Sequence, residues 1–271
     1  MTTNLHTNQT AVITGATSGI GKEFAYRFAG MGYNLIITGR RENLLNQVSC
    51  DIKNTYHVMV ETVIVDLAEK SELDILLNLI DNKNDIEVLV NNAGFGFNAD
   101  YNKNQISSQL KMLNVHVTAP VLLINKVIPQ MMANRTGTII NVTSLAAYTP
   151  TPDNAMYTSS KSFLTNYSES LSMQIRKYNI RVQCLCPGFT HTDFHKKQGL
   201  TANSFPLGVQ NWMEPSEVVK YSLENLDKGK VICVPGATNR FIVHLISIVP
   251  RRMYYYFTNH FYKIGLNEKS K

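Results

Sequence analysis

The sequence predicts a single α/β domain in which a doubly wound parallel sheet of about seven strands carries helices on both faces. Three observations lead to this prediction. Short runs rich in Val and Ile alternate with segments of helical length, the runs are almost continuously apolar, and the first of them ends in a glycine-rich turn. Strands that are covered on both faces show such runs, and strands joined through helices pair in parallel. The length of 271 residues, 44% of them hydrophobic, suits one domain with a sizeable core.

Seven runs are expected to form the strands: AVITG (11–15), NLIITG (34–39), VIVDL (63–67), EVLVNN (87–92), TIINVTS (138–144), RVQCLCPG (181–188) and VICVPG (231–236). Helices are expected between them, among others over 19–31, 69–81, 118–134 and 155–178. No internal repeat or low-complexity linker divides the chain, so residues 1–271 are expected to form one unit. An open parallel sheet binds ligands at the carboxyl ends of its strands, where the strand order reverses.

The formal net charge of +6 is concentrated in a basic tail over residues 237–271. There Glu268 is outnumbered by Arg240, Arg251, Arg252, Lys263, Lys269 and Lys271. The basic residues of the remaining body are scattered and accompany no DNA- or RNA-binding motif. We therefore expect no nucleic-acid partner.

Cysteine usage and the amino terminus bear on the cellular compartment. The four cysteines lack CxxC spacing, and Cys184 and Cys186 fall in a strand-like run, so we expect reduced core thiols rather than disulfides or a zinc site. MTTNLHTNQT has no apolar run behind a basic cluster, and no segment reaches the ~18–20 unbroken apolar residues of a spanning helix. The resulting expectation is a cytoplasmic location.

The glycine-rich turn TGATSGIG, residues 14–21, follows the first strand and opens a helix. Its glycines allow a tight turn and let the backbone approach a pyrophosphate, which the positive end of the helix attracts. A simple βα turn is the alternative. The position after the first strand of an alternating chain favours nucleotide binding.

The second strand ends in Thr38-Gly39-Arg40-Arg41, where dinucleotide-binding folds distinguish their cofactors. An acidic residue there would bind the ribose 2′-hydroxyl, whereas arginines accommodate a 2′-phosphate. No acid occupies 39–41, so the sequence favours NADP(H) over NAD(H). The alternative is that both arginines are solvated charges at the start of the next helix.

Polar residues also follow the later strands. The run NNAG (91–94) ends one strand, and Ser144 ends the next. Tyr157 and Lys161 lie four residues apart, so on a helix they share one face. An ammonium near the phenol would lower its pKa from about 10, which acid–base catalysis requires. The alternative is an exposed pair on an amphipathic helix.

Together these motifs resemble the short-chain dehydrogenase/reductase family, in its single-domain branch with the TGxxxGxG and YxxxK motifs. The resemblance covers roughly residues 9–236 and keeps the family's order: TGATSGIG, Asp66-Leu67, NNAG, Asn114, Ser144, YTSSK (157–161) and CPGFTHT (186–192). It implies a Rossmann-type fold, a nicotinamide cofactor and a homodimer or homotetramer. The helices over 104–134 and 155–178 are the expected contact surfaces between subunits.

The resemblance implies four catalytic roles. Tyr157 would be the general acid that protonates a carbonyl oxygen during reduction, and Ser144 would hold that oxygen. Lys161 would lower the pKa of the tyrosine and bind the nicotinamide ribose. Asn114 would hold a water that links Lys161 to solvent.

The resemblance also assigns a cofactor site. Gly15, Ser18, Gly19, Ile20 and Gly21 would line the pyrophosphate, Asp66 with Leu67 would reach the adenine, Asn92 with Ala93 and Gly94 would lie near the ribose, and Pro187, Gly188, Thr190 and Thr192 would enclose the nicotinamide. The chain departs from the family's usual NADP pattern at Ser18, where a basic residue often occurs. The expected NADP(H) preference therefore depends on Arg40 and Arg41.

The segment 191–213 is expected to form a lid over the substrate. It mixes Phe194, Leu200, Phe205, Leu207 and Trp212 with Lys196 and Lys197. This composition suggests a mainly apolar substrate with an anionic end, unless the lysines simply solvate the lid. His116, His191 and His195 do not have the spacing of a metal site, so no metal is expected, and they are interpreted as polar residues of loops and of the pocket.

The tail shows helical spacing in two parts. Ile242, Leu245, Ile246 and Val249 form one stripe, Pro250 interrupts it, and Met253, Tyr256 and Phe257 resume it beside Arg251 and Arg252. Such basic amphipathic helices can lie on an anionic membrane. Packing on the protein itself, as a pocket wall or subunit contact, is the favoured interpretation.

The sequence thus predicts an NADP(H)-dependent oxidoreductase that reduces a ketone to a secondary alcohol by hydride transfer. A 3-oxoacyl or other lipid-like carbonyl compound is the expected substrate. Two alternatives stay open: a non-catalytic NADPH-binding sensor or scaffold, and a lipid-handling protein of the membrane surface.

Overall fold

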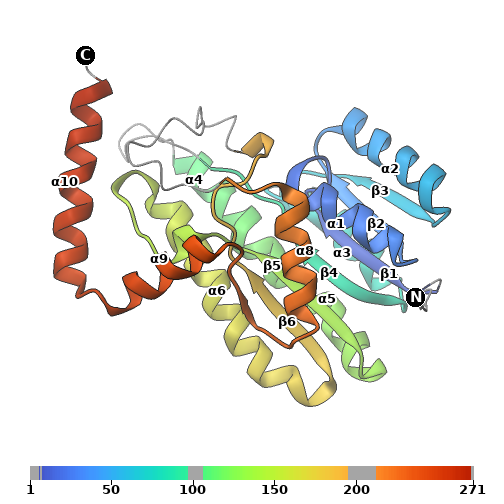
Figure 1. Ribbon diagram of the computed structural model, residues 1–271. Helices are drawn as coiled ribbons and strands as arrows, with labels where there is room; N and C mark the ends of the chain where they lie inside the picture. The colour runs from blue at the N-terminus through green and yellow to red at the C-terminus, as the bar shows by residue number, and fades with distance from the viewer. Residues whose placement is uncertain (1–5, 7, 97–105, 195–211, 270–271) are drawn as a thin grey trace.

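The computed structural model describes residues 6, 8–96, 106–194 and 212–269. They form the predicted α/β fold, with a seven-stranded parallel sheet in the order β3-β2-β1-β4-β5-β6-β7 (Figure 1). The strands are β1 (Thr10–Thr14), β2 (Asn34–Gly39), β3 (Val60–Ile64), β4 (Ile86–Asn91), β5 (Gly137–Val142), β6 (Ile180–Leu185) and β7 (Ile232–Cys233). The order reverses between β1 and β4, so the ligand crevice is expected beyond their carboxyl ends.

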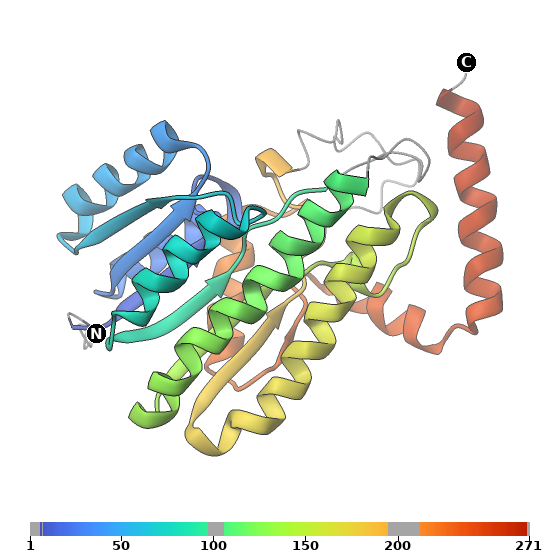
Figure 2. The same ribbon diagram turned by 180° about the vertical axis from the view of Figure 1, so that it is seen from behind.

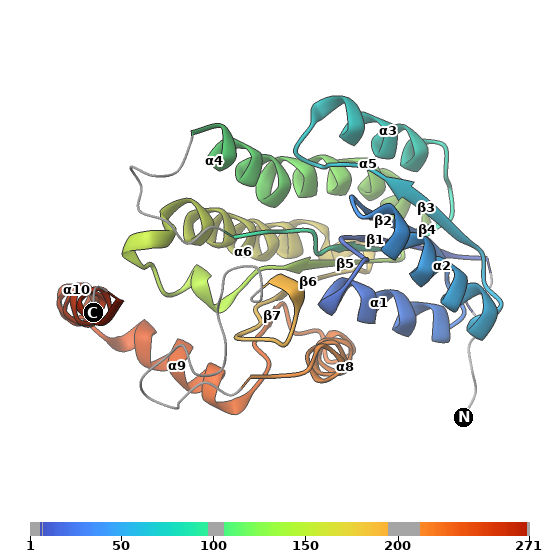
Figure 3. The same cartoon turned by 90° about the horizontal axis from the view of Figure 1, so that it is seen from above.

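Helices cover both faces of the sheet, as Figures 2 and 3 show from two further directions. One face carries α1 (Gly19–Gly30), α2 (Glu42–Tyr56) and α8 (Pro215–Leu226); the other carries α3 (Lys70–Asp81), α4 (Ile106–Leu113), α5 (Ala119–Asn134) and α6 (Ala155–Ile175). Successive side chains of a strand point to opposite faces. In β1, Ala11 and Ile13 therefore belong to one hydrophobic core and Val12 to the other, which explains the continuous apolar run.

The helical stretch Ile106–Asn134 is long and apolar enough to cross a membrane by length and composition. Its α5 part instead packs on the sheet, where Leu123, Ile124, Val127 and Met131 are fully buried. A helix with this packing is a core helix of the α/β domain.

Two strands differ most from the prediction, and β5 and β6 end at Val142 and Leu185, before the predicted ends at 144 and 188. β3 spans Val60–Ile64 rather than 63–67, because the chain turns at Asp66. The Asp66 amide donates to Glu72 at 2.6 Å, and its carboxylate accepts the amide of Ala68 at 3.0 Å. β7 is also shorter than predicted and contains only Ile232 and Cys233.

The tail forms two helices, α9 (Ala237–Ile248) and α10 (Arg251–Lys269), separated near Pro250. Arg240 of α9 donates to the Tyr221 hydroxyl of α8 at 3.0 Å, so α9 touches the body. α10 stands clear of the sheet and its covering helices (Figures 1 and 3). The Tyr254 hydroxyl of α10 still donates to the carbonyl of Pro150 at 2.9 Å, and the favoured interpretation of the tail as a pocket wall or subunit contact stays a prediction.

Candidate active site at the carboxyl ends of the strands

A cavity of about 290 Å³ opens beyond the carboxyl ends of the central strands. Nearly all the predicted site residues line it: Gly15, Ser18, Gly19, Ile20, Arg40, Arg41, Asp66, Leu67, Asn92, Ala93, Gly94, Ser144, Tyr157, Lys161, Pro187, Gly188, Thr190 and Thr192. Two predicted residues, Gly21 and Asn114, are not part of its wall. The fold therefore brings together segments that are far apart in the sequence.

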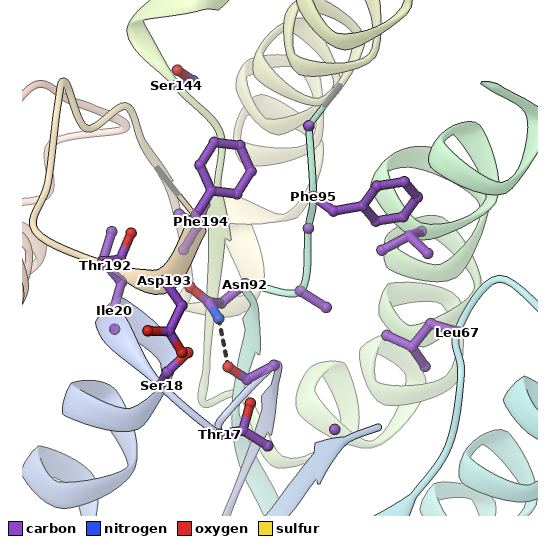
Figure 4. Close-up of a pocket in the computed structure, with 18 of the residues that line it drawn as sticks. Thr17, Ser18, Ile20, Leu67, Asn92, Phe95, Ser144, Thr192, Asp193 and Phe194 are labelled. Carbon is purple, nitrogen blue, oxygen red and sulfur yellow. Dashed lines mark hydrogen bonds between the residues drawn. The ribbon is translucent and has the colours of Figure 1, made fainter. Parts of the chain in front are cut away.

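The glycine turn is held by Asn92. Its Nδ2 donates to the carbonyl oxygens of Thr14 at 3.0 Å and Gly15 at 3.1 Å (Figure 4). Gly15 has φ +69°, which side chains rarely adopt, and a Cβ there would lie 2.9 Å from the Cα of Ala93. The turn thus presents bare backbone to the cavity at the start of α1, as a pyrophosphate requires.

Gly21 has a different role from the one predicted for it. A Cβ at this position would lie 2.3 Å from Asn92 Nδ2 and 2.4 Å from the carbonyl oxygen of Gly15. Gly21 is needed so that α1 can pack closely beneath the turn. It shapes the cradle without lining it.

Thr14 supports the site from behind the cavity wall, and no role was predicted for it. Its hydroxyl accepts the amides of Asn92 and Ala93, both at 3.0 Å, and donates to the carbonyl of Val90 at 3.3 Å. These bonds join the carboxyl ends of β1 and β4, where the strand order reverses. The position of Thr14 as the first residue of the glycine motif was the available signal.

The two arginines after β2 are both held at the rim of the cavity. Arg41 donates through Nη2 to Thr17 Oγ1 at 2.6 Å and Ser18 Oγ at 2.7 Å, and through Nη1 to Asp193 at 2.7 Å. Figure 4 shows Thr17, Ser18 and Asp193 on the same side of the cavity. The Arg41 guanidinium lies over the glycine turn, so an anion bound at the turn would contact it.

Arg40 donates through Nη1 to Asp66 at 3.1 Å, and its guanidinium lies 5.9 Å from the centre of the Phe95 ring. Asp66 therefore faces a cation on one side while its other oxygen accepts the backbone amide of Ala68. The pair lies between the ends of β2 and β3, where the resemblance places the adenosine end of the cofactor.

Tyr157 and Lys161 lie one turn apart on α6, and both reach the cavity, as does Ser144. The Lys161 side chain is buried, and its Nζ donates to the carbonyl of Val142 at 3.0 Å and lies 5.8 Å from the centre of the Tyr157 ring. Burial lowers the pKa of Lys161 to about 8. Burial also raises the pKa of Tyr157 to about 12, although a hydrogen bond with Ser144 acts to lower it.

The expected lowering of the tyrosine pKa by Lys161 is therefore not what the structure shows. Removing the phenol from water disfavours its charged form, and this effect is larger than the stabilisation by its neighbours. The Lys161 ammonium is directed to a backbone carbonyl rather than to the phenol. Tyr157 is consequently protonated at neutral pH, which is the state that a proton donor needs.

Asn114 begins a π-helical turn, Asn114–Thr118, that joins α4 to α5. Its side chain is exposed and donates to the carbonyl of Ala68 at 3.0 Å. Its predicted water link to Lys161 stays a prediction. The extra residue of a π turn also changes which of the following side chains face the interior of the protein.

His116 lies in this turn and is a buried neighbour of the predicted catalytic residues, 1% exposed. Its Nε2 accepts the amide of Phe95 at 3.1 Å, so the ring proton lies on Nδ1, which is 3.0 Å from Ser160 Oγ. The ring meets Tyr157 edge-on at 5.6 Å between centroids. Burial holds the pKa of His116 well below its ordinary value, and the charge of Lys161 lowers it further.

The base of the predicted lid is described, whereas 195–211, with Lys196, Lys197, Leu200, Phe205 and Leu207, lies outside the described residues. His191 N donates to Met213 O, and Met213 N donates to Phe189 O, both at 3.0 Å, so the two ends of the segment are joined. Phe194 points into the cavity (Figure 4), and its ring lies 5.9 Å from that of Tyr157.

Comparison with known proteins identifies the family and the fold. A family model described as short chain dehydrogenase matches residues 9–203. The chain belongs to the short-chain dehydrogenase/reductase family. A solved short-chain dehydrogenase from Sphingobium yanoikuyae, in complex with NADPH, is 26% identical with a TM-score of 0.80, over 89% of this chain and 96% of that one. The predicted family and fold are confirmed, and the chain is an oxidoreductase of the NAD(P)-dependent type.

Relatives with curated names differ in what their names state. An uncharacterized oxidoreductase of Staphylococcus saprophyticus is 27% identical over 86% of this chain and 97% of its own length. The inactive hydroxysteroid dehydrogenase-like protein 1 of Homo sapiens is 31% identical over 77% of this chain, and a very-long-chain 3-oxoacyl-CoA reductase of Laccaria bicolor is 34% identical over 65%. The matches span 62% and 53% of these two longer proteins.

Proposed function

We propose that this short-chain dehydrogenase/reductase is an NADPH-dependent enzyme that reduces a ketone to a secondary alcohol. The observation that carries the proposal is the convergence of Ser144, Tyr157 and Lys161 on the same cavity as the glycine turn. Gly15 and Gly19 have no room for a side chain, because a Cβ at either position would clash with neighbouring protein atoms. The backbone at these positions is therefore bare, as the close approach of a dinucleotide requires.

The bound cofactor would supply a hydride to the carbonyl carbon. The protein itself supplies the proton. Tyr157 gives its phenolic proton to the carbonyl oxygen as that oxygen gains charge, while the Ser144 hydroxyl donates a hydrogen bond to the same oxygen. The carbonyl becomes an alcohol and Tyr157 becomes a phenolate, which the nearby Lys161 ammonium stabilises.

NADPH rather than NADH is proposed because of the charges at the end of β2. Arg40 and Arg41 both line the cavity, and Arg41 already binds the two hydroxyls of the glycine turn. A 2′-phosphate would accept charge-assisted hydrogen bonds from these guanidinium groups. The NADPH complex of the Sphingobium relative supports this assignment.

A 3-oxoacyl or other lipid-like ketone is the proposed substrate. The ring of Phe194 lines the cavity, and the rings of Phe189 and Trp212 contact each other at the base of the lid. The name of the Laccaria relative includes a 3-oxoacyl substrate. The test is a panel of 3-oxoacyl esters, steroid ketones and short ketones, with NADPH oxidation followed by absorbance. Turnover of an acyl ketone that Tyr157→Phe abolishes is the expected result.

A non-catalytic NADPH-binding role is the second candidate, because the human relative is named inactive. The presence of Ser144, Tyr157 and Lys161 in one cavity favours catalysis. Calorimetric binding of NADPH without turnover on any member of the panel would support the second candidate instead.

We also infer a homodimer or homotetramer assembled through α4, α5 and α6. Large apolar side chains are exposed along these helices: Ile106, Leu110, Leu122, Phe163 and Met173. Sedimentation velocity should show an oligomer, and Phe163→Glu should shift it toward the monomer.

A further inference from the structure

The two tail helices expose large apolar side chains in series. On α9, Phe241, Leu245 and Ile248 have the spacing of one helical face and are 64%, 44% and 64% exposed. On α10, Met253 and Phe257 repeat that spacing and are 50% and 49% exposed. Single exposed apolar residues are ordinary, but a series along two consecutive helices is typical of a binding surface.

Cations and tyrosines accompany the series. Arg251 and Arg252 are exposed at the start of α10, and the run 254–256 consists of three tyrosines. The residues from 237 onward include six basic side chains and one acidic side chain. Helices that combine an apolar face, interfacial aromatic residues and basic residues bind at the boundary between lipid headgroups and acyl chains.

We propose that α9 and α10 dock the protein on membranes that contain anionic phospholipids. The tail surface comprises Phe241, Leu245, Ile248, Met253 and Phe257, flanked by Arg251 and Arg252. Its apolar residues would enter the headgroup region, and the guanidinium groups would pair with lipid phosphates. The proposal concerns the location of the protein and goes beyond its proposed reaction.

Charge favours lipid over a second copy of the chain as the occupant of this surface. A two-fold contact is self-complementary, so each copy would bring its own arginines to the same small interface, where like charges repel. Anionic lipid neutralises those arginines instead. The apolar residues on α4 to α6, including Phe163 and Met173, offer a separate surface for subunit contact.

The tail surface is also connected to the active site. The Tyr254 hydroxyl donates to the carbonyl of Pro150 at 2.9 Å. Pro150 belongs to the loop that leads from Ser144 to Tyr157, the two residues that act on the carbonyl oxygen. Docking of α10 would therefore hold this loop beside the membrane, where a substrate with an acyl chain resides.

The test is co-sedimentation of the full chain, with NADPH present, on vesicles of phosphatidylcholine alone or mixed with phosphatidylglycerol. We expect recovery with the anionic vesicles, weaker recovery at high salt and little recovery with phosphatidylcholine alone. Phe241→Ser with Phe257→Ser should lower the partition coefficient about tenfold or more, as should Arg251→Glu with Arg252→Glu.

Matched variants separate the tail surface from general surface chemistry. Arg176→Glu with Lys177→Glu makes the same charge change at an exposed site next to α6, and Met59→Ser with Ile75→Ser removes exposed apolar residues outside both the tail surface and the proposed subunit contact. Both should sediment like the unmodified protein. NADPH oxidation with a water-soluble ketone should be unchanged in the tail variants, so failure of the reaction and failure of docking are distinguishable.

Three results would overturn the proposal. The first is absence of the unmodified chain from the anionic vesicle pellet. The second is equal recovery of the tail variants and the matched variants. The third is a change of oligomeric state in the tail variants, by sedimentation velocity without lipid, together with unchanged vesicle recovery, because the surface would then bind a second copy of the chain.

Discussion

The sheet edge around Lys161 and the tail surface both combine cations with aromatic rings, yet they place the charge in opposite environments. Lys161 is 4% exposed and donates to the carbonyl of Val142, whereas Arg251 and Arg252 are exposed on α10. Burial disfavours the ammonium and lowers the pKa of Lys161 to about 8. A buried cation can thus exchange a proton near neutral pH, while exposed cations serve association. The environment of the side chain decides between chemistry and binding.

The sheet edge is catalytic only if the buried phenol donates its proton, and Tyr157→Phe tests this most directly. We expect reductase activity to fall by about 10³-fold, within the range for loss of general acid catalysis. The affinity for NADPH, measured by fluorescence titration, should change little, because the ring remains. Tyr167→Phe, on the same helix but outside the cavity wall, should keep full activity. Near-normal turnover by the Tyr157 variant would remove the proposed proton donor.

The second test concerns Arg40 and Arg41 at the rim of the cavity, whose environment lies between that of the buried Lys161 and that of the exposed tail arginines. Arg40→Ala with Arg41→Ala should weaken NADPH binding by about 10²-fold more than NADH binding, because charge-assisted bonds to the 2′-phosphate are lost. Titration calorimetry with both cofactors measures the difference, and NADH serves as the internal control for disturbed folding. Arg181→Ala, remote from the cavity, is the matched control. An equal loss for both cofactors would contradict the NADPH assignment.

The cost of burying Lys161 can be measured as stability. Lys161→Met keeps the length of the side chain but removes the buried charge, so it should raise the free energy of unfolding by about 2 kcal/mol at pH 7. The folded-state pKa of Lys161 is about 8 and lies below its unfolded value. The unmodified protein therefore gains stability from this group as the pH rises from 8 toward 10.5, and the advantage of the variant should shrink over that window.

Urea unfolding at pH 7 and pH 10 measures this change. Lys177→Met, at an exposed position, should show no such pH dependence. A destabilised Lys161→Met variant at pH 7 would mean that the hydrogen bond to Val142 outweighs the cost of burial.

The strands and most of the cavity residues could be predicted from the sequence alone, because apolar runs and glycine motifs have few other structural roles. The apolar runs predicted all seven strands, and the motif residues from Gly15 to Thr192 meet in one cavity with the exceptions of Gly21 and Asn114. Spacing could not show that Gly21 supports the turn from below, since that depends on its approach to Asn92. Nor could it show the high pKa of Tyr157, because burial is a property of the packed protein.

From the sequence, His116 was considered only as a metal ligand or as a polar residue of a loop or pocket, because the π turn that contains it could not be predicted. The turn directs the imidazole inward, where it links the amide of Phe95 to the hydroxyl of Ser160. Ser160 in turn donates to the backbone carbonyl of Tyr157 at 2.8 Å. His116 is therefore a positioning residue that fixes the loop after β4 and the first turn of α6 around the phenol.

The smallest expected effect follows from this chain of hydrogen bonds. His116→Leu should lower kcat about tenfold with little change in the KM for NADPH, because the phenol is held less accurately while the cofactor cradle is intact. Ser160→Ala should act in the same way, and the double variant should lose no more than the worse single variant, since both interrupt one chain. His116→Asn, whose amide can still donate to Ser160, should recover part of kcat. If the two substitutions multiply, or if only thermal stability changes, His116 serves the packing of the core and not the placement of Tyr157.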